Sequence, residues 1–143
     1  MNKNIIIFTL ILCFSAIIGK GQTLNLNDCI KMQKSSIVEI NNILQSKNHN
    51  WEFNHGMWSY INGTNTTFLR KTEGDLNNSE IILVTKNRDI IKTIYEDIKR
   101  YGMVQDRDRP AYIGKNYAVV FMAETNDNGE EIISIHIMPK SMY

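Results

Sequence analysis

Residues 81–102 read IILVTKNRDIIKTIYEDIKRYG and contain the clearest strand and the clearest helix of the chain. The run from Ile81 to Val84 is apolar on both sides, which favours a strand in the centre of a sheet. Apolar side chains then recur at helical spacing from residue 90 to residue 98, which predicts an amphipathic helix over about 88–101. Asn87 suits the N-cap of this helix, and Gly102 suits the position just after its end.

The segment before this stretch predicts more helix and then a hairpin. Residues 24–47 show helical periodicity in two pieces, and Ser36 and Glu39 have the spacing of a capping box at the start of the second piece. Residues 51–61 indicate an extended segment broken near His55-Gly56. Asn62-Gly63 is a strong signal for a tight turn, with a return strand over 64–71.

The segment after this stretch begins with a polar region, residues 103–112, which we expect to be a loop. Residues 117–123 and 132–138 are apolar strands that pair across a turn at 126–129. The predicted order is α-β-β-β-α-β-β. We therefore expect an α+β fold, a two-layer sandwich in which an antiparallel sheet of about five strands carries two helices on one face.

The N-terminus has the three parts of a secretion signal. A head with one positive charge precedes a largely apolar run over residues 5–18, and Gly19 and Gly21 follow as small residues. As a helix this run spans roughly 21 Å, whereas a membrane core is about 30 Å thick. We predict a cleavable signal over 1–21 and one mature domain over 22–143, either periplasmic or extracellular and without a membrane span.

Three other interpretations of this N-terminus are less consistent with the sequence. An uncleaved anchor would need a longer apolar run. A buried core helix would be apolar all round with nothing obvious to pack against. Lipid attachment at Cys13 would need a small residue in front of it, and Leu12 is large.

The composition excludes several classes of function. Lys3 and Lys20 lie in the predicted signal, so 14 basic and 15 acidic residues remain and the net charge of the mature chain is −1. This balance argues against a nucleic-acid partner. Only Cys29 remains after cleavage, so no internal disulfide can form, and we expect this thiol to lie on the buried face of the first helix.

Two groups of residues are candidates for binding. Aromatic side chains gather between residues 51 and 60 and could stack on a sugar or a peptide, although such rows more often belong to a core. The polar loop combines arginines with a tyrosine, residue types favoured at protein interfaces, although it could equally be a solvated loop with weak ion pairs. The candidate residues are Trp51, Trp58, Tyr60, Arg107, Arg109 and Tyr112.

Catalytic and metal chemistry find little support. A hydrolase would have to use His49, Glu52 and His55, or the pair Asp106 and Asp108. No metal-ligand spacing, phosphate-binding loop or nucleophile motif occurs, so we predict no metal and no cofactor. His136 shares its side of the last strand with Ser134, and we expect it to face solvent.

The chain resembles the small exported proteins of Bacteroidota that have no assigned activity. The resemblance rests on the signal ending in Gly-Lys-Gly-Gln at 19–22, the helix from Ser36 to Ser46 leading to Trp51, and the strand Tyr117 to Phe121. It implies no site residues.

We therefore expect a small exported binding module that is not an enzyme, of the kind that includes protein inhibitors and immunity proteins, with another protein or a cell-envelope component as its partner. The alternatives are an envelope-associated glycan-binding or structural protein, which requires Trp51, Trp58 and Tyr60 to be exposed together, and a periplasmic hydrolase.

Overall fold

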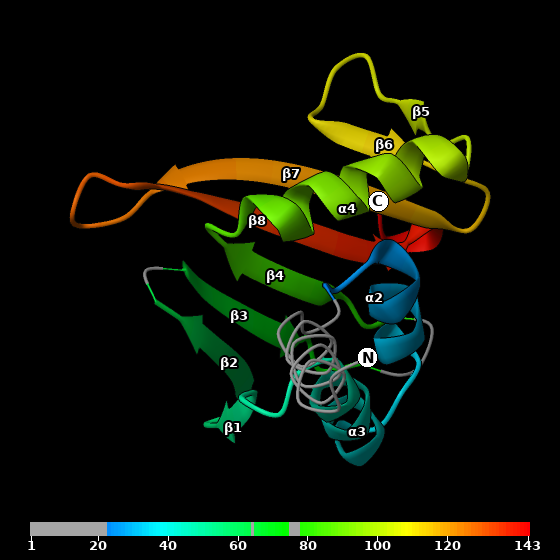
Figure 1. Cartoon of the computed structure of the whole chain (residues 1–143). Coiled ribbons are helices and arrows are strands. Elements are labelled where there is room, and N and C mark those ends of the chain that lie inside the picture. The colour runs from blue at the N-terminus through cyan, green and yellow to red at the C-terminus, as the bar shows by residue number, and fades with distance from the viewer. Residues whose placement is uncertain (1–22, 64, 75–77) are drawn as a thin grey trace, which may run out of the picture.

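A computed structural model describes residues 23–63, 65–74 and 78–143. In this part of the chain a layer of helices lies on one face of a twisted antiparallel sheet (Figure 1). The α+β class is confirmed. The predicted signal, residues 1–21, lies outside the described residues.

The elements follow one another along the chain in the order that Figure 1 labels. Their bounds are α2 Leu26–Gln33, α3 Ile37–Lys47, β1 Glu52–Asn54, β2 Met57–Asn62, β3 Asn65–Lys71, β4 Ile81–Thr85, α4 Arg88–Arg100, β5 Val104–Gln105, β6 Ala111–Ile113, β7 Tyr117–Thr125, β8 Glu131–Pro139 and the 3₁₀ turn η1 Lys140–Met142.

The sheet has eight strands in the order β1-β2-β3-β4-β8-β7-β6-β5, so the prediction of about five is wrong. The break at His55-Gly56 is a complete hairpin turn in which both residues have positive φ, 49° and 76°, and it separates β1 from β2. The segment predicted as a polar loop contributes β5 and β6. The strand of residues 81–85 is central, as predicted, because β4 pairs with both β3 and β8.

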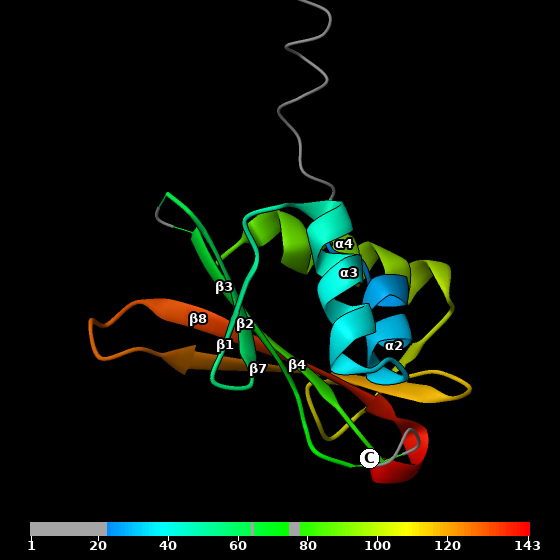
Figure 2. The same ribbon diagram turned by 90° about the horizontal axis from the view of Figure 1, so that it is seen from below.

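The described helices are three, not two, because the two helical pieces of residues 24–47 form separate elements. Ser36 begins α3 with the predicted capping box, in which its hydroxyl accepts from Glu39 N and the Glu39 carboxylate accepts from Ser36 N. In α4, Asn87 is the N-cap, and Gly102 follows its end with φ of +61°. Figure 2 shows all three helices on the same side of the sheet.

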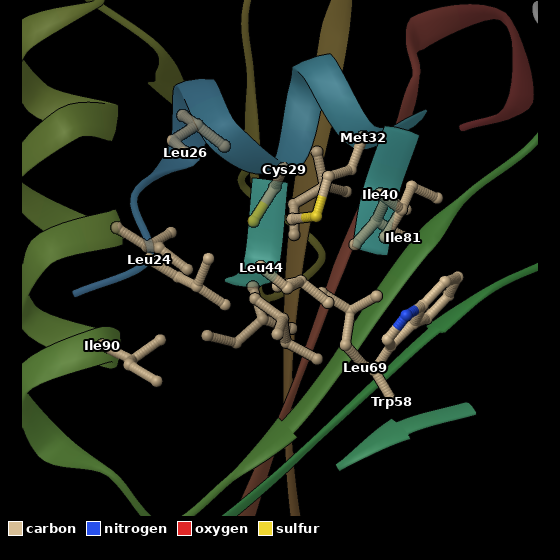
Figure 3. Packing of buried hydrophobic residues seen from close by; sticks show 14 of the residues in the cluster. Leu24, Leu26, Cys29, Met32, Ile40, Leu44, Trp58, Leu69, Ile81 and Ile90 are labelled. Carbon is tan, nitrogen blue, oxygen red and sulfur yellow. The ribbon is translucent and has the colours of Figure 1, made fainter. Parts of the chain in front are cut away.

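The core lies between this helix layer and the inner face of the sheet (Figure 3). The apolar face of α2 supplies Leu26, Cys29 and Met32, and α3 supplies Ile40 and Leu44. Cys29 is buried as predicted, and this burial raises the pKa of its thiol, so it is held as an unreactive apolar group.

Buried and half-buried charges tie the helices together. The buried carboxylate of Asp97 on α4 accepts a hydrogen bond from Leu26 N at the start of α2 (3.1 Å) and lies 3.3 Å from an Arg100 nitrogen. Asp28 on α2 pairs with Lys47 on α3 at 2.9 Å. The helix layer is therefore held as one unit against the sheet.

Candidate functional site

The aromatic residues of 51–60 are mostly core. Trp51 is 5% exposed and Trp58 only 1%, which agrees with the interpretation of this row as core and contradicts the alternative that requires the rings to be exposed together. Trp51 stacks on Tyr60 at 5.4 Å between ring centroids, and Tyr60, which is half-buried, accepts a hydrogen bond from Asn48. Strand alternation explains the burial, because the side chains of Trp58 and Tyr60 point from β2 toward the helix layer.

The second predicted group lies at the opposite end of the sheet order, near β5 and β6. Arg109 covers the ring of Tyr143 at 5.1 Å, and the Tyr143 hydroxyl donates to Asp106 (2.8 Å). Tyr112 packs edge-on against Tyr95 of α4 and against Phe121. The structure therefore separates the two predicted binding groups and ties most of the second group into local contacts.

Arg107 is the exception in this second group. It is exposed and forms no ion pair or hydrogen bond with any residue that the structure describes.

The candidate hydrolase residues do not form a catalytic arrangement. His49 and Glu52 line a hollow of about 260 Å³ together with Ser59, but no hydrogen bond joins them. His55 sits in the β1–β2 turn. Within the described residues no group of three or more His, Cys, Asp or Glu side chains could hold a metal ion.

His136 is partly buried rather than fully solvent-facing. Its Nδ1 forms a hydrogen bond with the Glu80 carboxylate across the strands, and only 18% of its side chain is exposed. As predicted, it lies on the side of β8 opposite the buried Ile135 and Ile137, but the expectation that it faces solvent holds only in part.

The sheet face opposite the helices is a further candidate surface. Residues paired directly across antiparallel strands lie on the same face, and the register joins Phe68 to Val84 and Ser134, and Arg70 to Ile82 and His136. No described helix covers this side of the sheet (Figure 2). We call it the open face; its members on β3, β4, β8 and β7 are Phe68, Arg70, Ile82, Val84, Ala118, Val120, Met122, Glu124, Ile132, Ser134, His136 and Met138, of which Ala118 and Ser134 are buried.

The open face is mostly apolar. One-sided antiparallel sheets commonly alternate apolar residues toward the core with polar residues toward water. Here Ile82, Val84 and Val120 are only half-buried and Met122 is 39% exposed, although each points away from the helices. Contiguous apolar surface of this kind marks interaction sites.

The charges of the open face differ in their pairing. Glu80 is bound by His136, and Glu124 accepts from the Ser134 hydroxyl at 3.2 Å. Arg70 is exposed and forms no ion pair or hydrogen bond with the rest of the described chain. The open face therefore offers one guanidinium, beside Phe68 and Ile82, that has no partner in the described structure.

The sequence predicted that one face of the sheet carries no helices, but not that this face is largely apolar or which residues form it. The signal was present, since Ile82 and Val84 alternate with core residues in a strand that is apolar on both sides. Such a strand normally predicts cover on both faces, so its apolar outer side conflicted with the prediction that the helices lie on one face of the sheet. The structure resolves the conflict, because all the described helices lie on one face and the outer side of β4 is apolar without helix cover (Figure 2).

The fold and the open face define a class of protein: a two-layer α+β domain whose antiparallel sheet has one helix-covered face and one apolar face without helices. No protein-family model matches the chain, and no curated protein or solved structure is significantly similar to it. Among the described helices, none combines the length and the apolar character needed to cross a membrane.

Proposed function

We propose that this chain is an exported binding module, not an enzyme, and that it docks another protein onto the open face. The observation that carries the proposal is the apolar character of a sheet face that no described helix covers. Burial of apolar surface contributes about 25 cal/mol per Å². A partner that covers Phe68, Ile82 and Val84 would remove from water the apolar surface that these side chains expose in the isolated domain, and this burial would favour binding.

Arg70 defines the chemistry of the partner. A guanidinium at the margin of an apolar patch pairs well with a carboxylate, and arginine is enriched among the residues that dominate interface energies. We therefore propose a partner protein with an apolar surface and an Asp or Glu side chain placed to meet Arg70. A second copy of this chain is the rival occupant.

The predicted signal supports export. We propose that residues 1–21 are removed and that the mature chain begins at Gln22. Mass spectrometry of protein recovered after expression of the full chain in a bacterial host tests this proposal. A mass that includes Met1 to Gly21 contradicts it, without bearing on the open face.

A photo-crosslinking experiment tests the docking surface. A photoreactive residue is placed at Val84 on the open face and, as the control, at Lys92 on the exposed side of α4 in the full chain expressed in its native cells. We expect a discrete adduct with one other protein at Val84 and none at Lys92. Adducts at both positions, none at either, or an adduct of two copies of this chain would each refute the proposed partner.

The adduct is then reconstituted from purified proteins. Arg70→Glu should weaken the complex about tenfold or more, the equivalent of about 1.4 kcal/mol. Arg107→Glu is the matched control, because Arg107 is also exposed and forms no ion pair or hydrogen bond within the described structure. Exchange of the partner's contacting carboxylate for lysine should restore binding to Arg70→Glu. Equal effects of the two arginine variants would contradict the assignment of Arg70.

A further inference from the structure

A hollow of about 330 Å³ lies on the helix side of the sheet, between the start of α3, the β1–β2 hairpin and the end of β3. Its apolar wall contains Ile37 and Phe53, which are 56% and 44% exposed although they line a concave surface. The Phe53 ring packs on Trp58 with 4.6 Å between centroids. The hollow therefore presents an aromatic and aliphatic wall to solvent.

Two opposite charges line the same hollow. The Lys71 ammonium donates to the backbone carbonyl of Ser35 at 2.7 Å, which leaves two of its three N–H groups. Glu73 lines the hollow two residues further along the chain and forms no ion pair with any described residue. The nearby Glu39 carboxylate is already bound by the backbone and hydroxyl of Ser36.

From this combination we infer that the hollow binds a free amino acid with an apolar side chain. The ligand carboxylate pairs with Lys71, its ammonium group pairs with Glu73, and its side chain packs against Phe53 and Ile37. A volume of about 330 Å³ is at the lower end for ligand sites, about 300–1,000 Å³. That size suits a single residue rather than a peptide chain.

The site is independent of the proposed docking surface. Lys71 pairs with the buried Ile81, and Trp58 pairs with the buried Leu69, so both side chains lie on the helix side and not on the open face. Either proposal can therefore fail without the other.

Nuclear magnetic resonance of the full chain tests the inference with L-phenylalanine as the probe. The chain has two tryptophans, and the indole N–H signal of Trp58 is identified by its loss in Trp58→Phe. We expect a saturable shift of this signal below about 10 mM ligand, a range that detects a Kd near 1 mM. L-phenylalaninamide and N-acetyl-L-phenylalanine, which each lack one charge, should bind about tenfold more weakly.

Charge-neutral variants identify the two groups. Lys71→Gln should abolish the preference for the free acid over the amide, and Glu73→Gln should abolish the preference for the free amine over the N-acetyl form. The controls are Lys115→Gln and Glu131→Gln, at exposed positions that do not line the hollow, and both variants should bind the three ligands as the unchanged protein does. No saturable shift, or equal binding of all three ligands to the unchanged protein, would overturn the inference.

Discussion

Trp58 combines almost complete burial with an indole N–H that has no acceptor among the described residues. A buried donor without a partner costs about 1–3 kcal/mol, whereas the ring itself contributes through packing. The residue therefore stabilises the core by its shape while its polar atom opposes that gain.

Substitution of this tryptophan separates the two effects. Trp58→Ala should destabilise the protein by about 3–5 kcal/mol through loss of packing. Both variants remove the unpartnered donor, but Trp58→Phe also keeps most of the ring. Its small loss of packing is therefore offset by removal of the donor, and its cost should be below about 1 kcal/mol. Urea unfolding measures both values. Equal costs would show that the N–H has a partner in solution.

Asp106 provides a pH-dependent contact at the end of the chain. Hydrogen bonds from Asp108 N–H, and then from the Tyr143 hydroxyl, lower the pKa of the Asp106 carboxyl. Because the pKa is lower in the folded state, these bonds stabilise the folded protein fully at pH values above the usual pKa of an aspartate. The contribution is lost as the pH falls through the folded value.

Tyr143→Phe should raise the pKa of Asp106 only part of the way to its usual range, because the larger contribution, from the Asp108 N–H, remains. A side-chain carboxyl titration by NMR measures this shift. Glu130, whose pKa is lowered by Lys86 and Asn126, is the internal control and should titrate unchanged. An unaltered Asp106 would show that the tyrosine contact does not form in solution.

At the scale of elements, the helix starts are fixed by polar caps. The Asn87 side chain accepts from Asp89 N (3.0 Å) and Ile90 N (3.4 Å), which satisfies backbone groups that α4 cannot pair internally. The exposed Asn42 lies inside α3, where asparagine is a poorer helix former than alanine. The same residue type thus has opposite effects at the two positions.

The identical substitution should therefore change sign between these sites. Asn87→Ala should destabilise the protein by about 1 kcal/mol, and Asn42→Ala should stabilise it by a few tenths of a kcal/mol, that is about 0.3–0.6. Thermal and urea unfolding give the comparison. Destabilisation by both variants would mean that Asn42 makes a contact of its own in solution.

Elements with strong local signals were predictable, and those without were not. Asn87, Gly102 and Ser36 mark helix ends by chemistry that acts within a few residues, and the structure confirms all three. β5 and β6 have two and three residues, and they form because β6 pairs with the long strand β7. A polar segment gives no periodic sign of such pairing, so 103–112 was predicted as a loop.

Turn chemistry was predictable to within one residue. Asn62-Gly63 marks the β2–β3 hairpin correctly, but Asn62 still pairs with Asn65, so the turn begins at Gly63, whose φ is +60°. The candidate site was less predictable, because exposure of Trp58 or Phe68 depends on which face the helices cover. That choice is made by the packing of α2, α3 and α4 together.

At the scale of the whole molecule, substitutions on the two faces of the sheet should change the free energy of unfolding by different amounts. Leu83 and Val84 are neighbours on β4, but Leu83 is fully buried under the helices and Val84 lies on the open face. Leu83→Ala should cost about 2–5 kcal/mol. Val84→Thr keeps the β-branched shape and should cost less than about 1 kcal/mol.

Urea unfolding of the two variants checks the assignment of the faces. Ile137→Ala, also fully buried, should behave like Leu83→Ala and serves as the control for the inner face. A Val84→Thr variant as unstable as Leu83→Ala would show that the open face is covered in the isolated protein.

The lengths of the outermost strands bear on how this molecule can associate. β1 has three residues and β5 has two, so the first and the last strand of the sheet order each offer a neighbouring chain very few backbone groups to pair with. Short outer strands of this kind disfavour growth of the sheet by strand addition at these two borders, and with it fibre-like polymerisation.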